Sequence, residues 1–401
     1  INACNMILEE TKAFEEMTEE EDVQNVNRIK GECHFLRGCY YFLLANFYGK
    51  PYVASTAESD PAVPIKTSNY VEDKYYSRNS VAEVYKQIVT DLLDAEKFLK
   101  DVPKKSMWRA DINAVRLMLS RVYLYMCLYE EAEKYAALVT ENGPQLEDLN
   151  SFSGKEFLST NLSELIFSTG ASSLPGNVTF YSRNDGTEPG FVSGNDMRIS
   201  NELYEAYNPR NPIDLRLQYF VLDYDGSIRY RKLQGETFQT TDLSDVFLMR
   251  TAEAWLNLAE AAACAGDEPT ARKALNTLRE KRIKREFFDE SEVNGLTGEN
   301  LVQFIREERR RELCLEGHRW FDLRRYRVAE KYPQEVTVEH VYVNKTYNSS
   351  TYEYETLWIR KFVLTTDDPA WVMPLPKAEI DKNTGMLDNP RNERGYEDVN
   401  N

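Results

Sequence analysis

The side chains of this 401-residue chain that could do chemistry are three histidines, six cysteines and 66 carboxylates. The histidines, His34, His318 and His340, lie far apart, and none belongs to a HExxH metal-binding pattern. The chain also lacks a GxSxG nucleophile elbow, a P-loop and a GxGxxG loop. Paired carboxylates for glycoside hydrolysis carry no specificity as a signal, because their separation depends on the fold. We therefore expect no enzyme activity, no catalytic residue, no metal and no cofactor.

The six cysteines show no CxxC spacing, and most of them stand among apolar residues of expected helices. A disulfide framework is typical of small secreted domains without a sizeable core, and a chain of this length does not need one. We expect buried free thiols at Cys4, Cys33, Cys39, Cys127, Cys264 and Cys314.

The densest charges lie in residues 305–325, IREERRRELCLEGHRWFDLRR. Glu and Arg repeat there at three- and four-residue spacing, which favours ion pairs along a helix. Gly317 then interrupts that helix before Trp320 and Phe321, whose rings we expect to point inward. Such a run is typical of a solvated, salt-bridged helix face, and an anion-binding arginine cluster is the alternative. We interpret His318 as a packed structural histidine, because its own motif holds no nucleophile.

The chain carries 49 Lys and Arg against 66 Asp and Glu, a net charge of -17 at pH 7. Nucleic acids and anionic membrane surfaces are disfavoured as partners, because a binder must neutralise their phosphates with Lys and Arg. Apolar residues make up 42% of the chain, enough for a large core. No stretch approaches the roughly 18 apolar residues of a membrane span, and no signal peptide opens the chain. Because the first residue is Ile1, we expect the natural N-terminus to lie upstream.

Apolar positions at three- and four-residue spacing predict helices in six segments: 26–48, 80–100, 113–141, 246–265, 268–285 and 298–328. Residues 146–243 differ in kind, since they are rich in Gly and Pro and contain only short strand-like runs, 164–169 and 219–224. Residues 336–364 alternate apolar with polar side chains and predict a strand pair.

Two of the helical segments match the tetratricopeptide pattern, in which small residues let two helices approach closely. Leu119 is followed by Ala132, and Leu258 by Ala271, at the same spacing in both blocks. The other helices fit the repeat more loosely. We infer a mainly α fold, a tetratricopeptide-like helical superhelix of about four helix pairs with loop-rich excursions between them. Two unrelated helical hairpins in a generic bundle are the alternative.

Four blocks, in a fixed order along nearly the whole chain, carry a resemblance to one family. They are RIKGECHFLRGCYYFLL at 28–44, LMRTAEAW at 248–255, the charged run at 305–325, and PLPKAEID at 374–381 followed by Asn389 and Pro390. Together they resemble the SusD/RagB family, the surface nutrient-binding lipoproteins of Bacteroidetes. The start departs from the family pattern, because it shows no lipoprotein signal and Cys4 stands inside an expected helix.

The resemblance implies one SusD-like domain over 1–401 that lacks its N-terminal portion. Its helical repeat core would comprise 1–145 and 246–328, and its irregular ligand-binding excursions, with short strands, would comprise 146–245 and 329–401. Under this interpretation five residues of the charged run are architectural: Glu308, Arg309, Arg310, Glu312 and Arg319.

The resemblance also implies a function. The protein would be a non-catalytic glycan-binding lipoprotein, exposed on the outer membrane through a lipid anchor on the missing N-terminus. It would capture oligosaccharides or polysaccharides for polysaccharide utilization and deliver them to a SusC-like TonB-dependent transporter. The alternatives are a peptide-binding, RagB-like uptake protein and a tetratricopeptide scaffold for protein partners.

Sugar capture requires an aromatic ring for the C–H face of a pyranose and planar polar groups for its hydroxyls. The best candidates for ligand-binding residues lie in one glycine-rich stretch: Tyr181, Arg183, Asn184, Asp185, Phe191, Asn195 and Asp196. Alternatively, Tyr181 and Phe191 are buried anchors of a long loop. Competing aromatic residues are Tyr70, Tyr75, Tyr76, Tyr342, Tyr347, Tyr352, Tyr354 and Trp358. Aromatic residues at helical spacing, such as Tyr40, Tyr41 and Trp255, are expected in the core.

Overall fold

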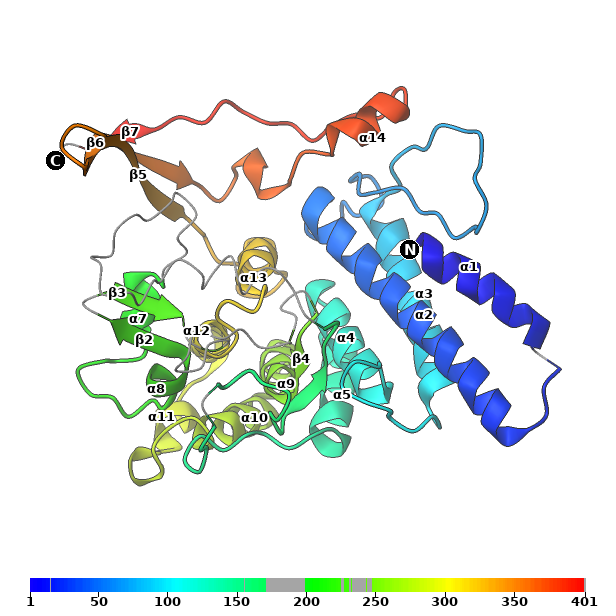
Figure 1. The fold of residues 1–401 in the computed structure, drawn as a ribbon. Helices are drawn as coiled ribbons and strands as arrows, with labels where there is room; N and C mark the ends of the chain where they lie inside the picture. Colours follow the sequence, from blue (N-terminus) through cyan, green and yellow to red (C-terminus); the bar gives the residue numbers. More distant parts are fainter. Residues whose placement is uncertain are drawn as a thin grey trace.

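The computed structural model describes residues 1–14, 16–154, 156–170, 199–224, 227–230, 232, 243 and 247–399. As predicted, the protein is mainly α. Figure 1 shows helices α1 to α3 on one side, helices α9 to α13 on the other, and α4 and α5 between them. The long helices are α1 Asn2–Glu10, α2 Glu20–Tyr48, α3 Val81–Leu99, α4 Ile112–Tyr125, α5 Tyr129–Asn142, α9 Thr251–Ala265, α10 Glu268–Glu280, α12 Gly298–Glu312 and α13 Arg319–Tyr326.

Helices α2 and α3 form the first helix pair, and their ends follow from local sequence. Three acidic residues occupy the first turn of α2, where they interact favourably with the positive end of the helix dipole. Helix α3 begins with a capping box, in which the Ser80 side chain accepts from the Glu83 amide and the Glu83 side chain accepts from the Ser80 amide. At Gly38 the two helices approach so closely that an added Cβ would lie 3.1 Å from Leu92 Cγ.

The two blocks that matched the tetratricopeptide pattern form the helix pairs α4–α5 and α9–α10. The predicted small residues, Ala132 and Ala271, are fully buried where the helices pack. The segment predicted at 113–141 is divided at Cys127, whose φ of 58° is in the left-handed region. Helix α9 ends at Gly266 with φ 98°, and the side chain of Asp267 caps α10. Helices α2–α3, α4–α5 and α9–α10 are thus three packed pairs, whereas α12 packs mainly against α9 and is followed by the short helix α13.

The remaining elements are short and connect or cover these helices. They are η1 Thr11–Phe14, α7 Asn201–Ala206, α8 Arg216–Phe220, η2 Arg285–Phe287, α11 Ser291–Asn294, η3 Pro369–Trp371 and α14 Lys377–Lys382. Strand β1 Leu165–Phe167 pairs with β4 Met249–Arg250, and β2 Val221–Tyr224 pairs with β3 Ser227–Tyr230, all antiparallel. The runs predicted at 164–169 and 219–224 thus each contain a strand, over 165–167 and 221–224, whereas residues 219 and 220 end helix α8.

The strand pair predicted at 336–364 is a long antiparallel hairpin. Strand β5 Val338–Asn348 pairs with β6 Glu353–Leu364, and β7 Glu397–Asp398 adds a short third strand beside β6. This sheet extends along one edge of the molecule, away from the helices (Figure 1). In β5 and β6, every side chain that the structure describes is at least partly exposed.

The largest hydrophobic core lies among α2, α3, α4 and α5 and includes Phe35, Tyr85 and Met118. Tyr41 is buried as predicted, but Tyr40 is 39% exposed, and its ring lies edge-on against the buried ring of Phe247. All six cysteines are free thiols, and five of them are buried as predicted. Within the described ranges, no helix is both long and apolar enough to cross a membrane.

The charged run contradicts one prediction, because much of it faces the interior. Three of its carboxylates, Glu308, Glu312 and Glu316, belong to a group of buried charges that we call the ion-pair cluster, whose other members are Glu164, Arg216, Lys232, Arg250 and Arg282. Arg250 contacts Glu164 at 2.6 Å, Glu312 at 2.6 Å and Glu316 at 2.8 Å. A solvated helix face was therefore the wrong expectation for these residues.

Partners from distant elements explain why these charges tolerate burial. Arg216 lies in α8, Arg250 in β4 and Arg282 after α10, so three guanidinium groups converge on Glu312 of α12. Burial by itself would raise the pKa of Glu312, but these three arginines hold it well below its usual value. Each desolvated charge is thereby compensated, which is the condition for burying it at all.

Candidate functional site

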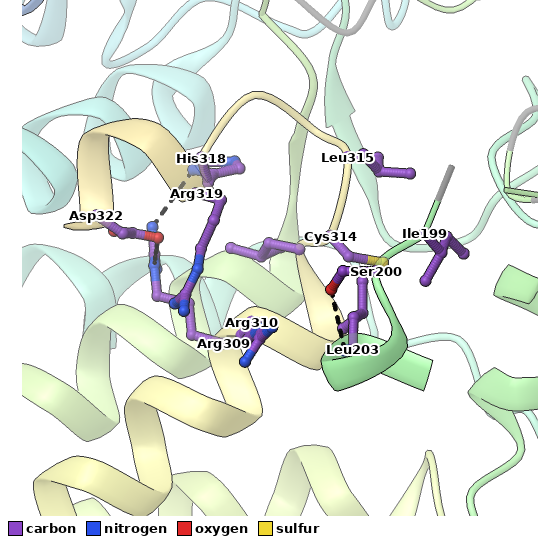
Figure 2. Close-up of a pocket in the computed structure, with 11 residues that line it drawn as sticks. Ile199, Ser200, Leu203, Arg309, Arg310, Cys314, Leu315, His318, Arg319 and Asp322 are labelled. Carbon is purple, nitrogen blue, oxygen red and sulfur yellow. Dashed lines mark hydrogen bonds and ion pairs between the residues drawn. The ribbon is translucent and has the colours of Figure 1, made fainter. Parts of the chain in front are cut away.

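A pocket of about 240 Å³ opens between α7 and the α12–α13 segment (Figure 2). We call it the arginine pocket, and its lining residues are Ile199, Ser200, Leu203, Arg309, Arg310, Leu313, Cys314, Leu315, His318, Arg319 and Asp322. Ile199 is the first described residue after the stretch in which the sequence predicts the ligand-binding residues. The pocket therefore adjoins the end of that stretch.

The floor of the arginine pocket is rigidly paired. The guanidinium of Arg309 donates to Asp322 Oδ2 at 2.8 Å and to Asn257 Oδ1 at 2.8 Å. Arg325 donates to the other oxygen of Asp322 at 2.9 Å. Burial would raise the pKa of Asp322, but Arg309 and Arg325 outweigh it and hold the pKa below its usual value. Arg309 and Asp322 are thus committed to each other and to the fold.

His318 is buried beside these groups, as the sequence predicted. Burial lowers its pKa well below the usual value, and the nearby charges of Arg121 and Arg309 act in the same direction. The ring is therefore neutral at pH 7, and its Nδ1 lies 3.4 Å from Arg309 Nη2. This environment fits a packed structural histidine.

Two arginines of the pocket are differently placed. In the described part of the chain, the side chain of Arg319 makes no hydrogen bond or ion pair. The nearest carboxylate to Arg310 is that of Glu307, at 3.7 Å. Burial lowers the pKa of Arg319, and the like charge of Arg310 lowers it further. The pocket therefore offers hydrogen-bond donors of positive charge that the fold does not use, a feature suited to an anionic group.

The residues that the sequence predicted as the ligand site all lie outside the described residues. They are Tyr181, Arg183, Asn184, Asp185, Phe191, Asn195 and Asp196. Their role stays a prediction. Among the described residues, no group of three or more His, Cys, Asp and Glu side chains is arranged to hold a metal ion.

One set of competing aromatic residues lies in the loop of residues 66–78. Tyr70 is 63% exposed and Tyr75 is 69% exposed, whereas Tyr76 is fixed by its hydroxyl, which donates to Glu72 Oε2 at 2.5 Å. Tyr76 also lines two pockets, of about 570 and 390 Å³. Its amide donates to Asn383 at 2.9 Å, which fastens the loop to the C-terminal segment. The loop thus presents two rings on a braced backbone.

The second set of competing aromatic residues lies on the β5–β6–β7 sheet. Tyr342 and Trp358 have ring centroids 5.6 Å apart, and the guanidinium of Arg360 lies 4.3 Å from the Trp358 ring centroid. The same guanidinium lies 3.8 Å from the ring of Tyr396, which the sequence analysis missed. Tyr352, in the turn of the hairpin, is 80% exposed. The rings near Arg360 are thus largely engaged with one another.

The comparisons with known proteins are consistent with this architecture. A family model described as the SusD family matches residues 135–396, and one described as starch-binding associating with outer membrane matches residues 1–124. None of the curated proteins compared matches the chain.

Solved structures agree over nearly the whole chain. A protein from Bacteroides vulgatus is 26% identical, with a TM-score of 0.74. The match covers 96% of this chain and 82% of that protein's chain. A SusD superfamily protein from Bacteroides thetaiotaomicron is 24% identical, with a TM-score of 0.74, and the match covers 97% of this chain and 83% of that chain. A laminarin-binding SusD-like protein is 20% identical with a TM-score of 0.62, covering 97% and 83%. The order of the four sequence blocks, the helical architecture and the family-model match agree, and the chain belongs to the SusD family.

Proposed function

We propose that this protein is a non-catalytic, cell-surface glycan-binding protein that captures oligosaccharides and delivers them to a SusC-like TonB-dependent outer-membrane transporter. The observation that carries the proposal is the match of residues 1–124 to a family described as starch-binding and associating with the outer membrane. The laminarin-binding relative supports a glycan as the ligand. We also propose that a lipid anchor holds the protein at the outer membrane.

The proposed site is the stretch that contains Tyr181, Arg183, Asn184, Asp185, Phe191, Asn195 and Asp196. Its rings would stack on the C–H faces of sugars, and its amide, carboxylate and guanidinium groups would pair with hydroxyls. Open sites of this kind bind weakly, because each ordered sugar loses hydration and freedom. The exposed rings of Tyr70 and Tyr75 are a further surface on which a long glycan would extend.

An affinity-gel and glycan-array screen tests the proposal. Starch, plant, laminarin-type and host mucin polysaccharides would be presented to the purified chain, with a peptide pool alongside. We expect retention by at least one glycan, which is recovered chemically unchanged. Retention by peptides alone would favour the RagB-like alternative, and cleavage of the glycan would contradict a non-catalytic role.

Two variants then test the site. Tyr181→Ala and Phe191→Ala should weaken glycan retention while the thermal unfolding midpoint stays unchanged. Phe287→Ala is the matched control, because that ring is 55% exposed in η2, outside the proposed site. A collapse of the thermal transition in either site variant would instead identify its ring as a buried anchor.

A further inference from the structure

The arginine pocket carries two positive charges that the described part of the fold compensates little: Arg310 has one ion pair, with Glu307 at 3.7 Å, and Arg319 has none. We infer that Arg310 and Arg319 bind the negative group of an acidic saccharide, a carboxylate or a sulfate carried on a sugar ring. The inference rests on the proposed function, since it names the class of glycan that this protein takes. It assigns a ligand-binding role to two residues that the sequence analysis interpreted as architectural.

The other arginines of residues 305–325 each donate at least one hydrogen bond within the fold, although Arg324 leaves Nε and Nη1 without a partner among the described residues. Arg306 and Arg325 both contact Glu260, at 3.4 and 2.6 Å, and Arg311 contacts Glu308 at 2.6 Å. Arg309 contacts Asp322, and Arg324 donates to the carbonyl oxygen of Gly49. In this stretch, only Arg310 and Arg319 donate no hydrogen bond to any described residue.

Two carboxylates near Arg319 in the sequence could have neutralised its charge, but in the structure both form ion pairs with other arginines. Glu316 is three residues before it and pairs with Arg250 at 2.8 Å. Asp322 is three residues after it and pairs with Arg309 and Arg325. Arg319 therefore faces the pocket with its charge uncompensated.

The geometry of the pocket suits one charged group on a ring. Figure 2 shows the side chain of Arg319 reaching from the start of α13 toward α12, which carries Arg310. The two like charges interact unfavourably, and an anion placed between them would relieve that repulsion. Guanidinium groups hold carboxylate and sulfate oxygens through paired N–H donors. Ile199, Leu203 and Leu315 add apolar wall for the carbon skeleton of the sugar.

The size of the pocket suits one charged sugar residue. Its volume of about 240 Å³ lies just below the ~300–1,000 Å³ typical of pockets for drug-sized ligands. The net charge of -17 does not prevent binding, because charges beyond a Debye length of ~8 Å are largely screened at physiological salt. The same screening weakens the attraction between the anion and the two arginines. Binding should therefore become weaker as the salt concentration rises.

Matched pairs of glycans test the inference by isothermal titration on the whole chain. Homogalacturonan oligosaccharides carry free carboxylates, and their methyl esters are the neutral counterpart. Dextran sulfate and dextran form the second pair, which separates sulfate from carboxylate as the source of charge. We expect the charged member of at least one pair to bind roughly tenfold to hundredfold more tightly, as hydrogen bonds to a charged group predict.

Variants assign that preference to the pocket. Arg319→Gln and Arg310→Gln should each remove most of the preference for the charged member, and Arg319→Lys should restore part of it. Arg285→Gln is the matched control, because Arg285 is an exposed arginine in η2. Since Arg310 makes only one long contact, its variant remains informative even if Arg319→Gln fails to fold.

The outcomes separate this inference from the proposed function. A parent protein that binds laminarin, but binds charged and neutral members of both pairs equally, overturns the inference alone. A charge preference that survives both Gln variants also overturns it, because the preference then arises at another site. A parent protein that binds no saccharide overturns the proposed function and the inference together.

Discussion

The arginines of this protein fall into two groups that residue type and spacing do not distinguish. Those of the ion-pair cluster, such as Arg250, are buried and contact two or three carboxylates each. Arg310 and Arg319 belong to the same charged segment, yet Arg310 has only one long ion pair, with Glu307 at 3.7 Å, and Arg319 forms no ion pair with any described residue. The difference shows that long-range partners decide whether a charged residue serves the fold or remains available for a ligand.

The two groups should therefore contribute very differently to the free energy of unfolding. Removing one member of a buried ion pair leaves an uncompensated charge in the interior and costs about 3–5 kcal/mol. Removing an exposed partner costs between 0 and about 1 kcal/mol. Four measurements of the free energy of unfolding therefore test the comparison, from the largest expected effect to the smallest.

Acidification should have the largest effect, because it removes charge from several buried carboxylates at once. Arg325 and Arg306 oppose the effect of burial and lower the pKa of Glu260 to about 2, and the pKa values of Glu308 and Glu312 are also lowered. The unfolded chain then binds protons more readily than the folded one. Stability should be complete above pH 4.5 and fall progressively as the pH drops toward 2, with Glu260 alone contributing about 3 kcal/mol.

Urea unfolding followed by circular dichroism at pH 7, 5, 4 and 3 measures this dependence. Glu260→Gln is the control, since it should unfold more easily at pH 7 and lose part of the acid sensitivity. A free energy of unfolding that stays constant between pH 7 and pH 3 would refute a role for these carboxylates in stability.

Arg250→Ala should have the next largest effect. The substitution leaves Glu164, Glu312 and Glu316 with one guanidinium fewer, and we expect a loss of about 3–5 kcal/mol. The urea midpoint of the variant measures it, with Arg272→Ala as the control, because Arg272 forms a partly exposed pair with Glu268 within α10. If the two variants unfold at the same midpoint, burial does not set the strength of these pairs.

Arg116→Ala should reduce the free energy of unfolding by an intermediate amount, because its ion pair is less buried than those of Arg250. Arg116 of α4 contacts Glu96 of α3 at 2.9 Å, and each side chain is about one fifth exposed. A pair at this depth is expected to contribute about 0.2–1 kcal/mol. Urea unfolding with and without 1 M NaCl checks this. The salt should remove most of the difference in unfolding free energy between the variant and the parent protein. A loss as large as that of Arg250→Ala would break the proposed relation between burial and strength.

Arg319→Gln should have the smallest effect on stability. The side chain makes no hydrogen bond to any described residue, so the free energy of unfolding should change by less than about 0.5 kcal/mol. A slight gain in stability is expected if relief from the charge of Arg310 dominates. Thermal unfolding of the variant beside the parent measures this, and a marked loss would show that Arg319 is architectural after all.

Much of the fold could be predicted from the sequence, because its determinants are local. Apolar spacing indicated the long helices, the matched positions of Ala132 and Ala271 indicated two helix pairs, and side-chain alternation indicated β5 and β6. Burial of Glu312 could not be predicted, since its partners Arg282 and Arg250 lie 30 and 62 residues away in the chain.

The candidate site was less accessible to sequence reasoning. Arg319 has carboxylates at the helical positions before and after it, so spacing favoured an architectural role. Only the structure shows that Glu316 and Asp322 are both committed to other arginines. The ligand-binding residues expected at 181–196 lie outside the described residues and remain a proposal.

The β5–β6 hairpin has a practical consequence for following this protein at work. Its described side chains all reach solvent, and its turn at Ser349 and Ser350 lies far from the helical core (Figure 1). A short peptide tag or a fluorophore attached at this turn should leave the packed interior undisturbed. The hairpin is thus a suitable attachment site, from which the distance and orientation of the protein relative to a bound glycan or to the proposed transporter could be measured.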